Sequence, residues 1–136
     1  VRNQFATRSW QHVLEPLSGY LLLAEQLLKS YPPPCEAFNF GPLLSSNCSV
    51  ADLIKNILQH WTGQWHVASD PMDVYEAGLL HLQIDKAHNL LGWSPRWDYA
   101  DTVSRTVNWY RDVHDGEDPY SRTLQDIKAY HSLIVH

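Results

Sequence analysis

Apolar side chains recur at helical spacing between residues 14 and 29, and this pattern predicts a long amphipathic helix. At 100° per residue, one wide face gathers the side chains of Leu17, Tyr20, Leu21, Leu23, Ala24, Leu27 and Leu28. Leu22 falls on the other side, among polar residues. Pro16 suits the first turn because its missing N–H has no partner there, and the prolines that begin at Pro32 end the helix.

Helical spacing also occurs in four further segments, and we predict helices over residues 50–62, 86–91, 99–114 and 123–133. Ser49 and Asp52 form a capping-box pattern at the start of the first of these, and Gly63 ends it. Asp85 is expected to cap the short second one, which Gly92 terminates. In the helix over 99–114, the positions expected to face the core are Val103, Val107 and Tyr110.

Short alternating or β-rich stretches predict strands between these helices. The three candidates are Ala37–Phe40, a stretch around Trp65 and Val67, and the stretch containing Leu80, Leu82 and Ile84. These strands are too few and too short to close a sheet unaided. We therefore predict a mixed α/β fold in a single domain over residues 1–136, with helices packed on a few short strands.

The composition is that of a globular protein, with 44% hydrophobic and 18% charged residues. A net charge of −5 with scattered basic residues argues against a nucleic-acid partner. Cys35 and Cys48 have neither metal-site nor CxxC spacing, so we expect a reduced, cytoplasmic protein. No apolar run approaches the roughly 18 residues that cross a membrane, so no membrane partner is expected.

Familiar catalytic and cofactor motifs are absent from the sequence. None of the six glycines falls into a GxGxxG turn, and no tyrosine is followed four residues later by lysine. The closest histidine pairs, His60 with His66 and His81 with His88, lack the i,i+4 spacing of helical zinc ligands. We therefore expect no catalytic residue, no bound cofactor and no metal site in this chain by itself.

Four segments together resemble the CDP-glucose 4,6-dehydratases, which are extended short-chain dehydrogenases. In chain order they read RNQFATRSWQHVLEPLSGYLLLAEQL, AFNFGP, DKAHNLLGWSPRWD and VNWY. The block HVLEPLSGYLLLA is specific to that family, whereas the LGW motif is shared by many related epimerases. The resemblance covers nearly the whole chain, in the order and spacing of the family.

The resemblance implies one half of a two-part enzyme. In the family, an N-terminal Rossmann-like part holds NAD and the Thr/Tyr/Lys catalytic set, and a smaller C-terminal part closes over the sugar nucleotide. This chain is similar to the C-terminal part. It begins with Val1 rather than Met, and we expect it to be a piece of something longer. We accordingly expect no complete Rossmann domain, no NAD binding and no dehydration of CDP-glucose by the chain alone.

The resemblance also suggests substrate-binding residues. Arg8 matches an arginine that related enzymes place on the substrate diphosphate, and a guanidinium can hold a phosphate with two hydrogen bonds. We favour this role over a surface ion pair, and Arg2 is the second candidate. Asn39, within FNFG, matches an asparagine near the nucleotide. Its amide can donate to a phosphate or satisfy a carbonyl at the end of a strand, and both readings stand.

Three neighbours of Arg8 read first as structural residues. Trp10 precedes a helix and is expected to be a core residue. His12 is expected to make a local hydrogen bond near the helix start. Glu15 reads as a favourable negative charge at the helix N-terminus.

One segment departs from the family pattern. Where the family has His, Tyr, Lys and Asp in HEAHYLKLD, this chain has Gly78, Leu79, His81 and Gln83. The changes remove polar groups from a stretch that, by resemblance, faces the nucleotide. They indicate either a divergent member with altered substrate preference or relaxed selection on the sugar site.

The leading hypothesis is therefore the nucleotide-sugar-binding portion of a CDP-glucose 4,6-dehydratase-like protein, with CDP-glucose as the ligand. Two alternatives stay open: an interaction or oligomerisation module without a ligand, and part of a dehydratase or epimerase for another nucleotide sugar. In the family, by resemblance, the helix over 14–29 lies against the Rossmann sheet. We therefore expect the isolated chain to self-associate through this helix, unless its own C-terminal helices cover it.

Overall fold

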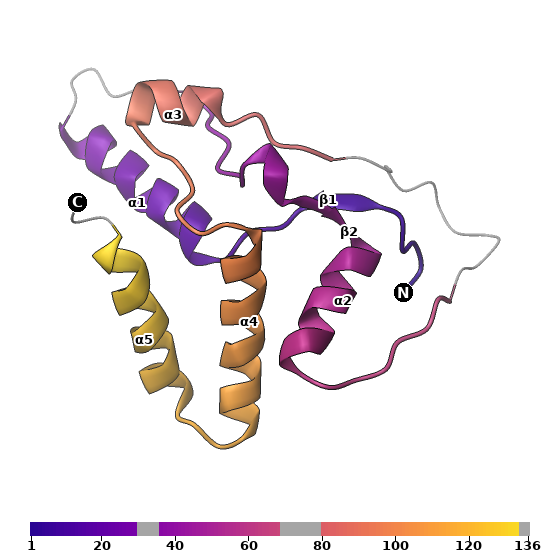
Figure 1. Ribbon diagram of the computed structural model, residues 1–136. Coiled ribbons are helices and arrows are strands. Elements are labelled where there is room, and N and C mark those ends of the chain that lie inside the picture. Colours follow the sequence, from indigo (N-terminus) through magenta and orange to yellow (C-terminus); the bar gives the residue numbers. More distant parts are fainter. Residues whose placement is uncertain (30–35, 69–79, 134–136) are drawn as a thin grey trace.

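The computed structural model describes residues 1–29, 36–68 and 80–133. Within them the elements are β1 (Thr7–Ser9), α1 (Leu14–Lys29), the 3-10 helix η1 (Leu44–Ser46), β2 (Asn47–Ser49), α2 (Val50–His60), α3 (Asp85–Leu91), α4 (Tyr99–His114) and α5 (Pro119–Ser132). Helix α4 packs between α2 and α5, and α3 lies against α1 on the other side of the molecule (Figure 1). The mixed α/β prediction is confirmed as a helical assembly with a small sheet.

Local capping signals decide where the helices begin and end. Helices α1 and α4 have the predicted bounds. At the start of α2 the hydroxyl of Ser49 accepts a hydrogen bond from the backbone N–H of Asp52, as predicted. This helix ends at His60, before Gly63, because the next residue, Trp61, takes extended backbone.

The two remaining helices differ slightly from the prediction. Gly92 ends α3 in the left-handed conformation, with φ of 68°, but Asp85 is the first helical residue and not the cap. Helix α5 begins at Pro119, four residues earlier than predicted. Asp118 caps it by accepting from the backbone N–H of Ser121, and proline suits the first helical position.

The predicted strands are wrong. Within the described residues the only ladder joins β1 to β2 in antiparallel register, with Arg8 opposite Cys48. The segments 37–40 and 80–84 are connected by a side chain, the amide of Asn39 donating to the carbonyl of Gln83 (3.4 Å). Residues 65–68 meet the N-terminal residue through two hydrogen bonds, Val1 N to His66 O and Ala68 N to Val1 O. An alternating pattern indicated extended backbone, whereas a ladder also needs a partner at the correct register.

One part of the core joins α1 and α3 through the 36–43 segment. Phe40, Ala87 and Trp93 are its buried centre. Half-buried side chains pack around them: Leu22, Leu23, Phe38, Ile84 and Leu91. Gly19 permits this packing, since a Cβ at that position would lie 2.2 Å from a ring carbon of Phe40.

A second part of the core surrounds Trp97. His12 and Tyr130 contact its ring edge-to-face, with centroids 4.7 and 4.9 Å away, and the guanidinium of Arg105 lies 4.3 Å from the ring centroid. Trp10 is half-buried and donates its ring N–H to the carbonyl of Cys48. Trp10 therefore has a structural contact, although it is not in the buried core.

Glu15 is fully buried, and its role exceeds the favourable helix charge that the sequence predicted. Its carboxylate accepts hydrogen bonds from the backbone N–H groups of Arg96 and Trp97 and from the hydroxyl of Tyr130 (2.6 Å). Ser18, one turn later, also contacts the Tyr130 hydroxyl and accepts from Trp93 Nε1. The polar side of α1 is thus an inner side, tied to the loop before α4 and to α5.

An ion pair joins helices α4 and α5. Arg122 on α5 contacts Asp112 on α4 (2.8 Å), and within α5 it also contacts the buried Asp126 (3.0 Å). The hydrogen bond from Arg122 holds the pKa of the Asp112 carboxyl below its usual value. Val103 and Val107 face the core as predicted, whereas Tyr110 is exposed, contrary to the prediction. No helix in the described part of the chain is both long and apolar enough to cross a membrane.

Candidate functional site

Arg8 lies at the centre of β1, half-buried, with its guanidinium Nη1 donating to the carbonyl of Thr7 (2.8 Å). Successive side chains of a strand point to opposite faces, so Arg8 and Ser9 lie on different faces of the two-stranded sheet. Arg8 shares its face with its register partner, Cys48. Burial raises the pKa of the Cys48 thiol and raises the pKa of the nearby Tyr99 hydroxyl to about 12. The Cys48 thiol, opposite Arg8 in the ladder, is therefore neutral at pH 7.

The opposite face of the two-stranded sheet is connected to the segment that departs from the family pattern. The hydroxyl of Ser9 donates to Asn47 Oδ1 (3.0 Å) and also contacts the carbonyl of Leu80 (3.1 Å). Asn47 in turn contacts a ring nitrogen of His81 (3.4 Å). A chain of polar contacts thus leads from β1 to His81.

His81 is at the edge of a hollow of about 330 Å³, which we call the His81 hollow. Its lining residues are Pro42, Leu43, Leu44, His81, Gln83, Ile84, Asp85, His88 and Ser94. The hollow brings the NFGP loop together with the departing segment and with the motif around the LGW sequence. A ring nitrogen of His88 lies 2.8 Å from the hydroxyl of Ser94, which links α3 to the following loop.

The chemistry of the His81 hollow suits a polyhydroxylated ligand. Two imidazoles, an amide and a hydroxyl both donate and accept hydrogen bonds, and the Asp85 carboxylate accepts them. Pro42, Leu43 and Leu44 add an apolar wall for the face of a sugar ring or a base. The lining groups can therefore hold a ligand through hydrogen bonds and apolar contact.

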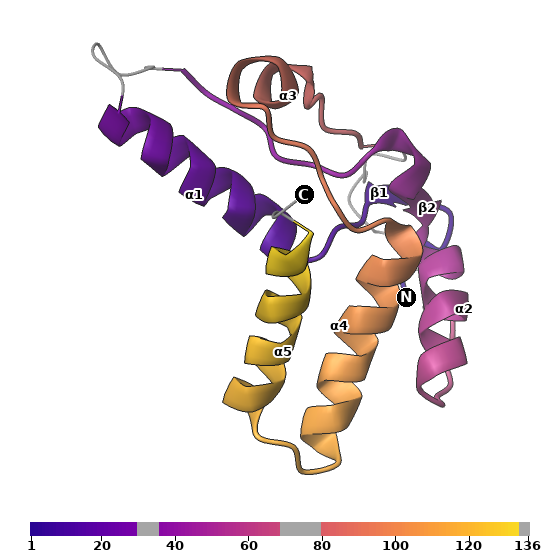
Figure 2. The same ribbon diagram turned by 60° about the vertical axis from the view of Figure 1, so that its left-hand side comes forward.

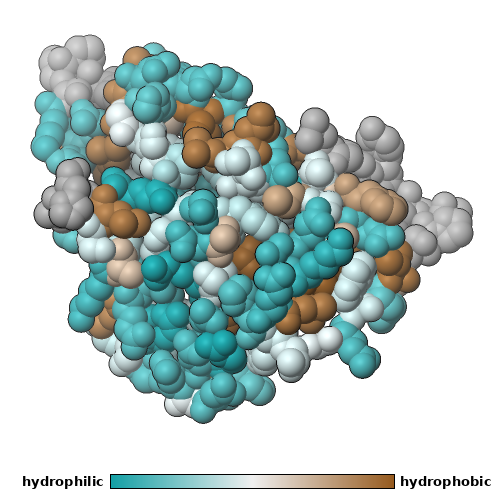
Figure 3. All heavy atoms as spheres, in the orientation of Figure 1, coloured by the Kyte–Doolittle hydropathy of each residue, from teal (hydrophilic) through white to brown (hydrophobic). Residues whose placement is uncertain are grey.

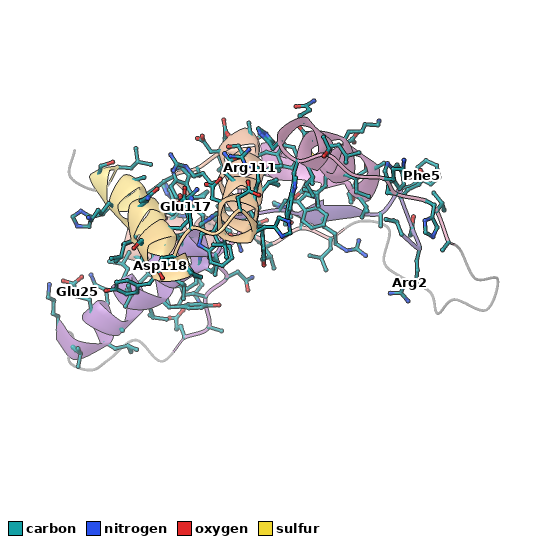
Figure 4. The ribbon with its side chains drawn as sticks, turned by 90° about the horizontal axis from the view of Figure 1, so that it is seen from below. Arg2, Phe5, Glu25, Arg111, Glu117 and Asp118 are labelled. Carbon is teal, nitrogen blue, oxygen red and sulfur yellow. The ribbon has the colours of Figure 1, made fainter. Side chains whose placement is uncertain are left out.

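The three predicted substrate residues come from different places, and none of them lines the His81 hollow. Asn39 is exposed, and its contact with the Gln83 carbonyl is the carbonyl-satisfying role that the sequence left open. Arg2 is exposed at the N-terminal end of the molecule, away from the far end of α1 that carries Glu25 (Figure 4).

Sequence reasoning missed most of the residues in the hollow. Gln83 stood out only as a departure from a pattern, and Ser94 gave no functional signal. His81 and His88 had been considered only as a histidine pair without zinc-site spacing, His81 also as a departure. Pro42 to Leu44 and His81 to Ser94 are separated by almost 40 residues, so only the tertiary structure shows that they share a site.

A larger hollow of about 420 Å³ lies where the start of α1 meets α4 and α5. Two of its polar lining groups, Asp126 and His12, make internal contacts. Asp126 pairs with Arg122, and His12 accepts a hydrogen bond from the backbone N–H of Leu14 (3.3 Å), which confirms the predicted local role of His12. Burial lowers the pKa of His12, so this histidine is neutral at pH 7.

No three His, Cys, Asp or Glu side chains gather as a possible metal site in the residues that the structure describes.

Comparison with known proteins identifies two nucleotide-sugar 4,6-dehydratases that are similar to this chain. No protein-family model matches the chain. A CDP-glucose 4,6-dehydratase from Salmonella typhimurium is 34% identical over 137 residues, which is 99% of this chain and 38% of that enzyme. A dTDP-glucose 4,6-dehydratase from Streptomyces antibioticus is 29% identical over 107 residues, covering 77% of this chain and 30% of that enzyme. The chain is homologous to nucleotide-sugar 4,6-dehydratases.

This chain spans well under half the length of the 4,6-dehydratases that it matches. The match to the Salmonella enzyme extends over 99% of the chain. The two-stranded sheet, the His81 hollow and α1 therefore all belong to the homologous region. The resemblance found in the sequence motifs is thereby confirmed.

Proposed function

We propose that this chain is the nucleotide-sugar-binding portion of a 4,6-dehydratase-like protein. The observation that carries the proposal is the His81 hollow, in which the NFGP loop meets residues 81–94 inside a region homologous to two nucleotide-sugar enzymes. The hollow offers hydrogen-bonding groups for hydroxyls and an apolar wall for a ring. CDP-glucose is the proposed ligand because the match to the CDP-glucose enzyme is longer and higher in identity than the match to the dTDP-glucose enzyme.

Arg8 is the proposed phosphate ligand. The support for it is the match of the ATRSWQHV segment and the half-buried position of Arg8 in the two-stranded sheet. Arg8 does not line the hollow. A variant at each place therefore separates the contribution of the phosphates from that of the sugar and base.

The redox cofactor implied by the resemblance, NAD, does not fit the residues present. A dinucleotide site needs a strand, a glycine-rich turn and the N-terminus of a helix in succession. Neither strand in the described part of the chain is followed by such a turn, and the sequence contains no GxGxxG. We therefore assign this chain a binding role and no step of a dehydration. A cytoplasmic location is part of the same proposal.

Titration of the ¹⁵N-labelled chain with CDP-glucose tests the proposal. Half of a two-part site gives up much of its contact area, so we expect a dissociation constant on the order of 10⁻⁴ to 10⁻³ M. Amide resonances of residues 81–88 should shift, and raised salt should weaken binding. dTDP-glucose in a parallel titration tests the choice of base, and millimolar NAD should leave the melting temperature unchanged.

Three variants locate the ligand. Arg8→Ala should weaken binding at least about tenfold, through loss of the charge-assisted hydrogen bonds to phosphate. His81→Ala should weaken it less, and Lys128→Ala, which removes one positive charge from α5, should have no effect. An unchanged affinity in Arg8→Ala refutes the phosphate assignment. The absence of any shift with several millimolar nucleotide sugar refutes the binding function.

A second candidate function is supported by a different observation. The outer side of α1 is apolar and exposed, which favours an interaction module.

A further inference from the structure

The two histidines of the His81 hollow are each held at one ring nitrogen by a neutral side chain. The amide nitrogen of Asn47 lies 3.4 Å from Nδ1 of His81, and the hydroxyl of Ser94 lies 2.8 Å from Nδ1 of His88. Within the described residues, no hydrogen bond involves the Nε2 atom of either ring. Each imidazole therefore has its Nε2 left over for a ligand.

Both supporting side chains are fixed by contacts outside the hollow. Asn47 accepts a hydrogen bond from Ser9 of the adjacent strand. Ser94 lies in the loop between α3 and α4, where Trp93 and Arg96 are hydrogen-bonded to the inner side of α1. In both ribbon views, the segment that enters α3 runs past the 3-10 helix toward the β1–β2 pair (Figures 1 and 2). The two rings are thus oriented before any ligand arrives.

The other polar groups of the hollow are mainly acceptors. The amide nitrogen of Gln83 donates to the carboxylate of Asp85, which leaves Oε1 of Gln83 and one carboxylate oxygen to accept from a ligand. No lysine or arginine lines the hollow. An ionised phosphate offers only acceptors and would meet the charge of Asp85, whereas a hydroxyl both donates and accepts. The lining therefore favours hydroxyl groups over phosphate.

The size and the apolar wall of the hollow suit one ring. Its volume of about 330 Å³ lies near the lower end of the range for ligand pockets, roughly 300–1,000 Å³. Leu43 and Leu44 in the wall are 56% and 66% exposed. In the space-filling view, hydrophobic residues reach the surface between α3 and the β1–β2 pair, with hydrophilic residues around them (Figure 3). The hollow has room for a single ring with a C–H face, not for a whole nucleotide sugar.

We propose that the His81 hollow binds a sugar ring of the ligand, with Nε2 of His81 and Nε2 of His88 hydrogen-bonded to its hydroxyls. Since a hydroxyl donates and accepts, each Nε2 finds a partner whichever ring nitrogen carries the proton. Asn47 and Ser94 are positioning residues, which orient the two rings through Nδ1. The inference rests on the proposed nucleotide-sugar binding and adds which part of the ligand enters the hollow.

Exchange of each histidine for two different amides tests the role of Nε2. A glutamine side chain places its amide near the position of Nε2, and an asparagine places it near Nδ1. In titrations with CDP-glucose, His88→Asn should weaken binding about fivefold, whereas His88→Gln should change it by less than about twofold. A purely structural role gives the opposite order, because only asparagine preserves the contact with Ser94. His81→Asn and His81→Gln should behave in the same way.

The nitrogen resonances of the rings give a direct readout. In long-range ¹H–¹⁵N spectra of the imidazoles, CDP-glucose should shift Nε2 of His81 and His88 more than their Nδ1. His131, an exposed histidine on α5 outside the hollow, is the matched control and should not respond. Ser94→Ala should shift Nδ1 of His88 in the free chain, which tests the positioning contact without any ligand.

Partial ligands identify which sugar enters the hollow, since CDP-glucose contains both a ribose and a hexose. Cytidine diphosphate has only the ribose, and glucose 1-phosphate has only the hexose. The compound that shifts the two Nε2 resonances contains the sugar that is bound. dTDP-glucose, with a hexose but no vicinal ribose hydroxyls, should agree with that assignment.

Three results overturn the inference while the proposed function stands. They are CDP-glucose binding that is unaffected by His81→Asn and His88→Asn, an asparagine variant that binds better than its glutamine counterpart, and equal Nε2 shifts with inorganic phosphate alone. Failure of the proposed function looks different. In that case no amide in the chain responds to any nucleotide sugar, and the inference falls with it.

Discussion

Helices α1 and α4 are both 16 residues long and amphipathic, but they bury opposite kinds of side chain. In α4 the apolar Val103 and Val107 are buried, at 3% and 6% exposure, between α2 and α5. In α1 the carboxylate of Glu15 is buried, and most of the leucines are in water.

The difference arises from what each helix contacts. Helix α4 has neighbours on its apolar side, and burial of that side stabilises the hairpin with α5. On the inner side of α1, three donors satisfy Glu15, and hydrogen bonds or close packing accommodate Ser18 and Gly19. The hydrophobic pattern of a helix therefore shows which face is suited to burial, but it does not show that this chain supplies the cover.

The largest effect is expected for the buried carboxylate of α1. Glu15→Ala removes the acceptor for Arg96 N–H, Trp97 N–H and the Tyr130 hydroxyl, and it leaves a cavity. We expect a loss of about 3–5 kcal/mol in the free energy of unfolding, measured by urea titration at pH 7. Glu25→Ala, on the exposed part of the same helix, should change it by less than about 0.5 kcal/mol. Equal effects of the two variants contradict the anchoring role of Glu15.

A smaller effect is expected where the inner side of α1 approaches the core. Gly19→Ala places a methyl group against the ring of Phe40, and this crowding should cost about 1–3 kcal/mol. Gly63→Ala is the matched control, because its added Cβ would meet only an ordinary contact with Leu58, at 3.4 Å. Thermal unfolding of the two variants measures the difference, and a fully stable Gly19→Ala chain shows that α1 does not pack on Phe40 as described.

The smallest effect is expected on the outer side of α1. Leu28→Ala should change the free energy of unfolding by less than about 0.5 kcal/mol, since Leu28 is almost fully in water. Val107→Ala in α4, although it removes a smaller side chain, should cost about 2 kcal/mol through lost burial and a cavity. If Leu28→Ala costs as much as Val107→Ala, this chain covers the outer side of α1, and the contrast between α1 and α4 is wrong.

Helix positions were readable from the sequence because their signals are local. Caps such as Ser49 and the left-handed Gly92 act on residues within one turn, so spacing along the chain contains the information. The start of α5 was misplaced because the cap at Asp118 and the proline after it were not used. The predicted strands failed for a different reason, since pairing depends on a partner far away in the chain.

The same distinction between local signals and long-range packing applies to the candidate site. The motifs around Arg8 and Asn39 identified a homologous region, and the comparison with two 4,6-dehydratases confirms that homology. The motifs did not reveal that residues from 42–44 and 81–94 line one hollow. They also did not reveal that Arg8 and Ser9 lie on opposite faces of a two-stranded sheet. Those relations result from how β1, β2 and the 80–84 segment pack together.

The sequence by itself determined five helices, the bounds of two of them and the family resemblance, because helix formation and motif identity depend on residues close together in the chain. The tertiary structure alone decided which side of α1 is inside. Its leucines were equally compatible with a buried face, but the carboxylate of Glu15 has three donors that come from positions more than 80 residues away. A buried charge is stable only where such donors surround it, and long-range packing is what brings them there.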